Sequence, residues 1–252
     1  MRCIILAAGE GTRLRPYTEN LPKCMVEVDG KSLIERQIEI LNSCDIFDII
    51  GIGGYLHDKL EGIFPKLLVN SEYANTNMVE TLLCARNELK DGSIISYGDI
   101  VYSDTILKAL MSSEYDISVV VDDNWLEYWS ARFVNVLDDA ESLQISDSGF
   151  LTDIGAQPSS LNDIQSQYIG LIKVSKAGAN ILLDLYDKCV EQGTINFKPV
   201  KQAYMTDLLQ EAINSDISIK AVRSQSLWIE VDSVSDLKNE ITSWRLSRLG
   251  NE

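Results

Sequence analysis

A glycine-rich turn follows the first apolar run of the chain and carries the residues with the clearest chemistry. The turn has the sequence G-E-G-T-R over residues 9–13, directly after an apolar run over residues 2–8. Glycines let a backbone approach a ligand closely, and successive N–H groups in such a turn form a cradle for anions. Lys23 adds a second cation ten residues after Arg13. The pattern predicts a phosphate-binding loop over residues 9–13 that is served by Arg13 and Lys23.

Two familiar phosphate-binding loops do not fit this turn. A Walker A loop needs G-x-x-x-x-G-K-[ST], which the sequence lacks. A dinucleotide-binding loop needs G-x-G-x-x-G, and Leu14 stands where its third glycine would be. A plain turn is the alternative for the glycine pair alone, but Thr12-Arg13 and the downstream Lys23 favour phosphate binding.

Two aspartates each close a predicted strand. Asp99 follows the apolar run 93–97, and Asp232 ends the run 227–231. Ligands of open α/β folds collect at the carboxyl edge of the sheet, and two carboxylates beside phosphate oxygens suit Mg²⁺. Each aspartate alone fits a turn or helix cap equally well, but beside the phosphate-binding loop the pair predicts a magnesium site. Glu230 shares the strand face of Asp232 and is a further metal or substrate ligand.

An aromatic stripe at helical spacing lies among acidic residues. Its members are Trp125, Tyr128 and Trp129. Aromatic rings flanked by carboxylates can hold an ammonium group by cation–π attraction, and the same spacing equally fits the core-facing side of a helix. We therefore treat Trp125 and Trp129 as candidate substrate-binding residues. Arg132 and Lys173 are candidates for contact with a substrate phosphate or carboxylate.

Composition excludes several other functions. His57 is the only histidine, no G-x-S-x-G motif occurs, and we expect His57 on a solvated helix away from the chemistry. Five cysteines without C-x-x-C spacing argue against disulfides or a zinc site and favour a cytoplasmic location. The net charge of -16 disfavours nucleic acids and anionic membranes as partners. No apolar run approaches the ~20 residues of a membrane span, so we expect no membrane insertion.

Short apolar runs alternate with helical patterns and predict an α/β fold. We expect one domain over residues 1–252, with a Rossmann-like, mostly parallel mixed sheet flanked by helices. The predicted strands of the first half span 2–6, 46–53, 67–69, 93–97 and 117–121, and its predicted helices span 32–41, 55–64, 77–89 and 104–111. Later helices are predicted at 176–189, 205–214 and from Ser233 onward, and later strands at 217–222 and 227–231.

The middle of the chain has a different pattern. Residues 123–175 hold short strand-like pieces around turn signals, which predict a small antiparallel insertion beside the main sheet. The pieces are Arg132–Val136, Ser142–Ile145, Phe150–Ile154 and Tyr168–Val174.

The segment LAAGEGTRLRPYTENLPKCMVEVDGKSLIERQIE, residues 6–39, resembles the N-terminal signature of sugar-phosphate nucleotidyltransferases. Gly98-Asp99 and the W-I-E-V-D run over 228–232 match later motifs of that superfamily. The resemblance implies the glycosyltransferase-A-like nucleotidyltransferase fold. It also assigns nucleotide contacts to Leu6, Ala7, Ala8, Gly9, Glu10, Gly11, Thr12, Arg13, Lys23, Thr76, Asn77 and Met78. Asn77 fits a helix cap equally well.

Other segments resemble the phosphocholine cytidylyltransferase-like branch of the superfamily. They are S-E-Y-A-N-T-N-M over 71–78, W-S-A-R over 129–132, D-D-A-E over 138–141, Q-Y-I-G-L-I-K over 167–173 and Y-M-T-D-L-L over 204–209. This branch implies Mg²⁺-dependent transfer of CMP from CTP to a small phosphorylated amine or amino acid, of phosphocholine or phosphoglutamine type, with release of pyrophosphate. It further implies a role in surface polysaccharide decoration and capsule biosynthesis, with residues 123–175 on the acceptor side.

One position departs from the family pattern. Relatives often carry a lysine before a proline where this chain has Gln157-Pro158. The cation that meets the acceptor phosphate would then be Lys23, Arg132 or Lys173. Two alternatives stay open: a nucleotidyltransferase that joins UTP or dTTP to a sugar 1-phosphate, and a non-catalytic regulatory subunit of the same fold. The sequence does not define the oligomeric state.

Overall fold

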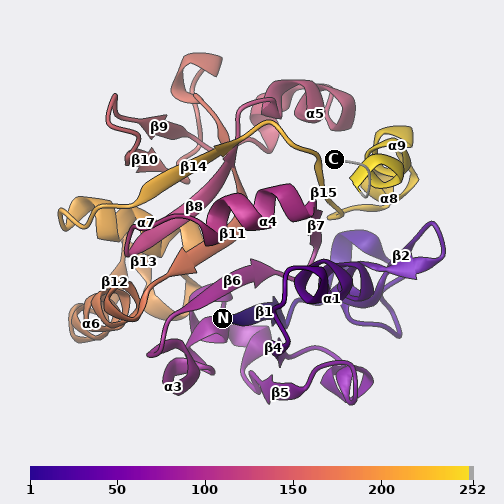
Figure 1. Ribbon diagram of the computed structural model, residues 1–252, viewed down its shortest axis with the longest axis horizontal. Coiled ribbons are helices and arrows are strands. Elements are labelled where there is room, and N and C mark those ends of the chain that lie inside the picture. The colour runs from indigo at the N-terminus through magenta and orange to yellow at the C-terminus, as the bar shows by residue number, and fades with distance from the viewer. Residues whose placement is uncertain (250–252) are drawn as a thin grey trace.

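A seven-stranded mixed sheet forms the centre of the protein in a computed structural model, which describes residues 1–249 (Figure 1). The strands in spatial order are β14 (Lys220–Ser224), β8 (Ile117–Asp122), β11 (Gln167–Val174), β6 (Ser93–Tyr97), β1 (Arg2–Ala7), β4 (Asp48–Gly53) and β5 (Lys66–Val69). β1 runs parallel to both β4 and β6, whereas β11 runs antiparallel to β6 and β8. The predicted α/β fold with a mostly parallel mixed sheet is confirmed.

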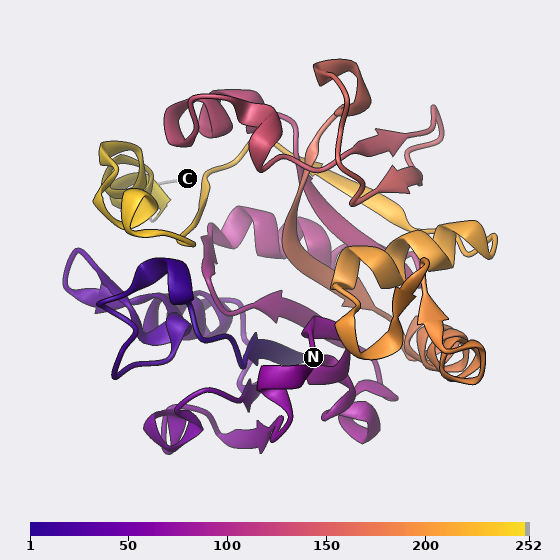
Figure 2. The same ribbon diagram turned by 180° about the vertical axis from the view of Figure 1, so that it is seen from behind.

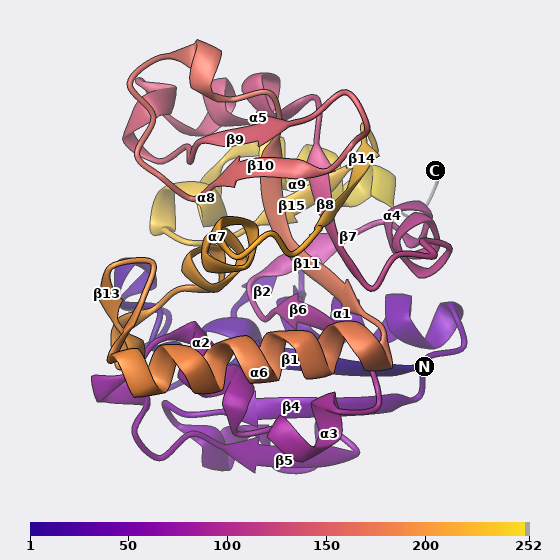
Figure 3. The same cartoon turned by 90° about the vertical axis from the view of Figure 1, so that its left-hand side faces the viewer.

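Helices cover both faces of this sheet. They are α1 (Leu33–Ser43), α2 (Met78–Leu83), α3 (Arg86–Leu89), α4 (Asp104–Met111), α5 (Trp125–Arg132), α6 (Lys176–Gln192), α7 (Met205–Asn214), α8 (Val234–Lys238) and α9 (Glu240–Leu249). Alternate side chains of β1 point to opposite faces, so Ile4 joins the core under α2, α3, α6 and α7, and Ile5 joins the core under α1 and α4. Figure 3 shows α6 in front of the sheet. No helix within residues 1–249 is long and apolar enough to cross a membrane.

The C-terminal segment packs against the N-terminal one. Figures 1 and 2 show α8 and α9 beside the chain that follows β1. A separate apolar cluster joins Leu14 and Leu33 of the N-terminal segment to Val231 and Leu246 of the C-terminal one. This packing joins two segments that lie near opposite ends of the sequence.

Four two-stranded ribbons accompany the main sheet. They are β2 (Glu27–Val28) with β3 (Lys31–Ser32), β7 (Ile100–Tyr102) with β15 (Trp228–Glu230), β9 (Leu143–Ile145) with β10 (Leu151–Ile154), and β12 (Thr194–Ile195) with β13 (Lys198–Pro199). The strand expected over 227–231 is present as β15, and it pairs with β7 outside the main sheet.

The predicted insertion is confirmed in only one part. β9 and β10 form the expected antiparallel pair. Arg132–Val136 is not a strand, because α5 ends at Arg132 and a 3₁₀ turn follows at Val136–Asp138. Tyr168–Val174 belongs to β11 inside the main sheet. Its buried side chains Ile169, Leu171 and Ile172 have neighbours on both faces, as is typical of an inner strand.

Three predicted helices differ from the structure. The helix expected over 77–89 is interrupted at Cys84 and Ala85 and divides into α2 and α3. The helix expected over 55–64 is a single 3₁₀ turn, His57–Leu60, where His57 is exposed as predicted. The helix expected from Ser233 is broken at Asn239, whose backbone is extended, and so divides into α8 and α9. After the break, Trp244 of α9 lies on the surface and is 43% exposed.

Candidate active site

A cavity of about 660 Å³ opens where β1 and β6 end and β11 begins. These three strands are neighbours in the sheet, and β11 runs antiparallel, so its first residues meet the last residues of β6. This is the edge at which open α/β folds bind ligands. The cavity is lined by residues 6–13, Lys23 and Thr76–Met78, and also by Asp99, Glu230 and Asp232.

The loop after β1 has the conformation of an anion-binding turn. Gly11 adopts φ 62°, in the left-handed region that favours glycine, and begins the 3₁₀ turn Thr12–Leu14. A Cβ atom at Gly11 would lie 3.1 Å from the Lys23 side chain. The Thr18 hydroxyl donates to the Gly11 carbonyl at 2.7 Å and fixes the turn. The loop therefore packs directly on Lys23, so both can face the same phosphate groups.

Thr76, Asn77 and Met78 approach the cavity from the start of α2. The Asn77 side chain accepts a hydrogen bond from the Met78 N–H at 2.9 Å and so caps α2. The buried Asn70 amide donates to the Thr76 hydroxyl at 3.0 Å. Asn77 thus serves as the cap and borders the cavity as well.

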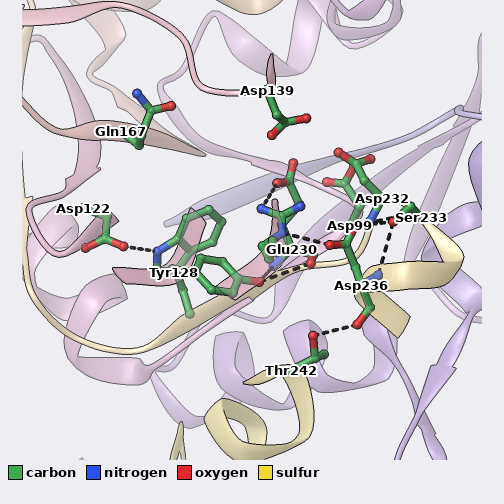
Figure 4. A network of polar contacts seen from close by, with 12 residues as sticks. Asp99, Asp122, Tyr128, Asp139, Gln167, Glu230, Asp232, Ser233, Asp236 and Thr242 are labelled. Carbon is green, nitrogen blue, oxygen red and sulfur yellow. Dashed lines mark hydrogen bonds and ion pairs between the residues drawn. The ribbon is translucent and has the colours of Figure 1, made fainter. Parts of the chain in front are cut away.

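Three carboxylates form a compact acidic cluster, shown in Figure 4. One oxygen each of Asp99, Glu230 and Asp232 lies within 4.8 Å of the others. The β7–β15 ribbon produces this arrangement, since Glu230 pairs with Ile100 and the Val231 N–H donates to the Asp99 carbonyl at 3.1 Å. The ribbon therefore joins two segments that are far apart in the sequence.

Two cations contact this cluster. The Lys23 ammonium donates to both Asp99 and Asp232, and the Arg13 guanidinium lies 3.2 Å from Asp232. Oδ1 of Asp99 is buried and has no hydrogen-bond partner among residues 1–249. An all-oxygen set with a free acceptor oxygen fits a hard divalent cation such as Mg²⁺.

Burial and neighbouring charges shift the pKa values in this cluster in opposite directions. Burial raises the pKa of Asp232, but the charges of Lys23 and Arg13 outweigh it and lower that pKa to about 2. Burial lowers the pKa of Lys23, but the charges of Asp99, Asp232 and Glu230 outweigh it and raise the pKa of the ammonium above its usual range. Lys23 therefore stays protonated at neutral pH.

Arg132 lies behind the cluster and not in the cavity. Its side chain is fully buried, with Nη1 2.9 Å from Glu230 and Nε 2.9 Å from Asp236. Asp236 in turn accepts hydrogen bonds from the backbone N–H groups of Asp232, at 3.2 Å, and Ser233, at 3.0 Å. The structure thus gives Arg132 a supporting position in place of the substrate contact expected from the sequence.

Two other candidates also lie away from the cavity. The Lys173 ammonium donates to the backbone carbonyls of Met111 and Ser113. Trp125 is buried and packs edge-to-face on Trp129, with ring centroids 6.2 Å apart. Neither residue borders the cavity, whereas Trp129 does. Most of the aromatic stripe is therefore core, which is the alternative that its spacing left open.

The position that departs from the family pattern is remote as well. Gln157 Nε2 donates to the Leu137 carbonyl at 2.7 Å, and Gln157 does not border the cavity.

Sequence reasoning missed several residues that line the cavity. They are Asp139, Glu141, Gln167, Tyr168, Tyr204 and Thr206. All six lie in segments that resemble the phosphocholine cytidylyltransferase-like branch, at 138–141, 167–173 and 204–209. That resemblance was the signal that could have indicated them.

Comparison with known proteins gives consistent similarities. A family model described as the MobA-like NTP transferase domain matches residues 3–149. The chain is 38% identical over 252 residues to a CTP:phosphoglutamine cytidylyltransferase of Campylobacter jejuni, covering 96% of this chain and 99% of that protein. It is 41% identical over 119 residues to a choline-phosphate cytidylyltransferase of Streptococcus pneumoniae, covering 46% of this chain and 52% of that protein.

A solved structure extends the similarity to the whole fold. The CTP:phosphocholine cytidylyltransferase from Streptococcus pneumoniae superposes with a TM-score of 0.71 at 26% identity. The match covers 96% of this chain and 98% of that one.

Proposed function

The chain belongs to the family of MobA-like NTP transferase domains, and on that premise we propose that it is a cytidylyltransferase, which transfers CMP from CTP to a small phosphorylated acceptor and releases pyrophosphate. One observation carries the proposal. A protonated lysine lies between two carboxylates, directly beside a glycine-rich loop that lines the same cavity. A non-catalytic subunit would have no need of this arrangement.

The loop and its two cations bind the triphosphate. Backbone N–H groups of residues 9–12 cradle phosphate oxygens, and Arg13 adds charge-assisted hydrogen bonds. The Arg13 side chain is 63% exposed and so is accessible to a ligand. Thr76–Met78 borders the same cavity and is placed to contact the base.

Asp99 and Asp232, with Glu230, are the residues that would hold Mg²⁺. When bound, this ion neutralises phosphate charge. Lys23 has its own role as a fixed positive charge at the reacting phosphates. It is held in place by two carboxylates before substrate arrives, so little reorganisation is needed during the reaction.

The reaction needs no general base. An oxygen of the acceptor phosphate bonds to the α-phosphorus of CTP, and the bond from that phosphorus to the bridging oxygen of the β-phosphate breaks. Pyrophosphate leaves with the electron pair. A phosphate monoester with a second pKa of about 6 is already ionised at neutral pH. Positioning and charge neutralisation by Arg13 and Lys23 then supply the catalysis.

The acceptor is a small phosphorylated amine or amino acid. Similar proteins are named for phosphoglutamine and choline-phosphate, both of which carry a cationic nitrogen. A cytoplasmic location and a role in decorating a surface polysaccharide or capsule are further parts of the proposal. The free thiols of all five cysteines support a reducing compartment.

A matrix of nucleotides and acceptors tests this function. Pyrophosphate release is measured with CTP, UTP, dTTP or ATP, each combined with phosphocholine, phosphoglutamine, phosphoethanolamine or glucose 1-phosphate, in the presence of Mg²⁺. We expect release with CTP and the nitrogen-containing acceptors. Faster release with UTP or dTTP and glucose 1-phosphate would instead identify a sugar-phosphate nucleotidyltransferase.

A further inference from the structure

The carboxylate of Glu141 borders the cavity without a partner of its own. Its backbone is firmly held, since its N–H donates to Gln167 Oε1 at 3.1 Å and its carbonyl accepts from Gln167 Nε2 at 2.5 Å. Gln167 is buried and is the first residue of β11. Within residues 1–249 no hydrogen bond or ion pair reaches the Glu141 carboxylate, although the main sheet fixes its position.

Glu141 lies on the opposite side of the reacting centre from the phosphate-binding loop. β6 leads to Asp99, with β1 and its loop on one side of β6 and β11 on the other. The pairing of Leu171 with Ser96 places Gln167, and with it Glu141, beside the end of β6. Glu141 therefore belongs to the part of the cavity that remains for the acceptor when the loop binds the triphosphate.

The surroundings of Glu141 are acidic and poor in water. Burial, with the charges of Asp207 and Asp139, raises its pKa to about 7, and Lys198 opposes this shift only in part. Lys198 is already committed to Asp207, at 2.9 Å. A desolvated carboxylate with acidic neighbours gains most from a cation that a ligand supplies.

Aromatic rings complete this side of the cavity. Tyr97 and Tyr168 both border it and pack edge-to-face, with centroids 5.8 Å apart. Ring faces and a carboxylate together attract an ammonium group and offer little to a neutral one. A cationic nitrogen thus suits this region better than a sugar hydroxyl does.

We propose that Glu141 binds the ammonium group of the phosphorylated acceptor, so that the cavity selects acceptors that carry a cation. The inference rests on the proposed function, since the acceptor occupies this region only if the chain transfers CMP. It concerns a residue to which the resemblance and the motifs assign no role.

The test combines one substitution with matched acceptors. Glu141→Gln keeps the size of the side chain and removes its charge. The acceptors are phosphocholine, phosphoethanolamine and phosphoglutamine, each paired with an analogue in which an uncharged group replaces the cationic one, such as 3,3-dimethylbutyl phosphate for phosphocholine. Glu127→Gln is the control, because Glu127 is exposed on α5 outside the cavity.

Glu141→Gln should raise the KM of the preferred cationic acceptor about tenfold or more, as expected for the loss of a desolvated charge contact. The KM for CTP and the turnover of the uncharged analogue should stay unchanged, and Glu127→Gln should behave as wild type. An equal loss with charged and uncharged acceptors, or a lower unfolding temperature with an unchanged acceptor KM, would overturn the inference. Pyrophosphate release with none of the acceptors would refute the proposed function itself.

Discussion

Lys23 shows how single residues set the chemistry of this cavity. Burial disfavours its ammonium, yet three carboxylates keep it protonated. The same contacts tie it to Asp99 and Asp232, so its charge is fixed in place before any substrate binds. Its role is therefore electrostatic, and a neutral side chain cannot replace it.

We predict that Lys23→Ala lowers kcat at least about 100-fold, the usual effect of removing one preorganised charge contact. Steady-state pyrophosphate release is the measurement, and circular dichroism checks that the fold persists. His57→Ala is the matched control and should keep wild-type kcat, because His57 is exposed away from the cavity. A Lys23→Ala enzyme that keeps more than half of the wild-type kcat would refute the electrostatic role.

The raised pKa of Glu141 leads to a second prediction at this scale. A carboxyl group with a pKa of about 7 is neutral below that pH and charged above it. Burial is the largest cause of this raised pKa; Asp207 and Asp139 add to it, and Lys198 opposes it. The KM of a cationic acceptor should therefore fall as the pH rises through 7.

The acceptor phosphate also ionises in this range, so Glu141→Gln provides the reference. In the Glu141→Gln variant, the acceptor KM should change with pH only through ionisation of the acceptor phosphate. The difference between the pH profiles of the two enzymes should fit the titration of a single group. Identical profiles for both enzymes would exclude Glu141 as the titrating group.

Among the elements, the β7–β15 ribbon has the largest effect on the site, because it brings Asp99 and Asp232 together. The sequence predicts Asp99 and Asp232 as a metal pair because each follows an apolar run, and the structure does bring them together. They meet at the end of a ribbon outside the main sheet, which no local pattern could indicate. The turn over residues 9–13 was predictable in more detail, since its conformation depends on adjacent residues.

Arg132 shows why the remaining expectations failed. Its partners Glu230 and Asp236 lie 98 and 104 positions away, so its side chain could not be placed from the sequence. The position of Lys173 could not be predicted for the same reason, since the carbonyl groups that it contacts, at Met111 and Ser113, lie at and just after the end of α4. Long charged side chains near a motif resemble ligand contacts until their tertiary partners are known.

Removal of the buried Arg132 charge should destabilise the fold. Arg132→Met leaves Glu230 and Asp236 without their partner, and breaking a buried pair costs about 3–5 kcal/mol of unfolding free energy. Chemical denaturation measures the change. Arg86→Ala removes a more exposed ion pair with Asp187 and should cost less than about 1 kcal/mol. Equal stability of the two variants would contradict the supporting role of Arg132.

At the scale of the molecule, the net charge of -16 does not represent the local charge of the cavity, which holds both cations and carboxylates. Arg13 and Lys23 meet the acidic cluster on one side, and Arg13 also lies 4.0 Å from Asp139. The carboxylate of Glu141 lines the same cavity, and no cation among residues 1–249 forms an ion pair with it. On the proposed function, phosphate groups and a cationic nitrogen would find complementary charge in different parts of one cavity.

Binding of Mg²⁺ and CTP in this cavity should raise the thermal stability of the whole protein. CTP with Mg²⁺ should raise the unfolding temperature more than CTP with EDTA, because a ligand that binds only the folded state stabilises it. Thermal denaturation of wild type and of a double Asp99→Asn, Asp232→Asn variant measures the effect. An equal rise in both proteins would show that these carboxylates do not hold the ion.

Phosphorus NMR of the product decides between cytidylyl transfer and the other reactions that a phosphate-binding cavity could perform. With CTP, Mg²⁺ and the acceptor preferred in the matrix, the acceptor phosphate signal should be replaced by two coupled diphosphate signals, with one equivalent of free pyrophosphate. This pattern requires a new bond between the acceptor oxygen and the α-phosphorus of CTP. Release of CMP, or an acceptor signal that stays unchanged while CTP is consumed, would contradict it.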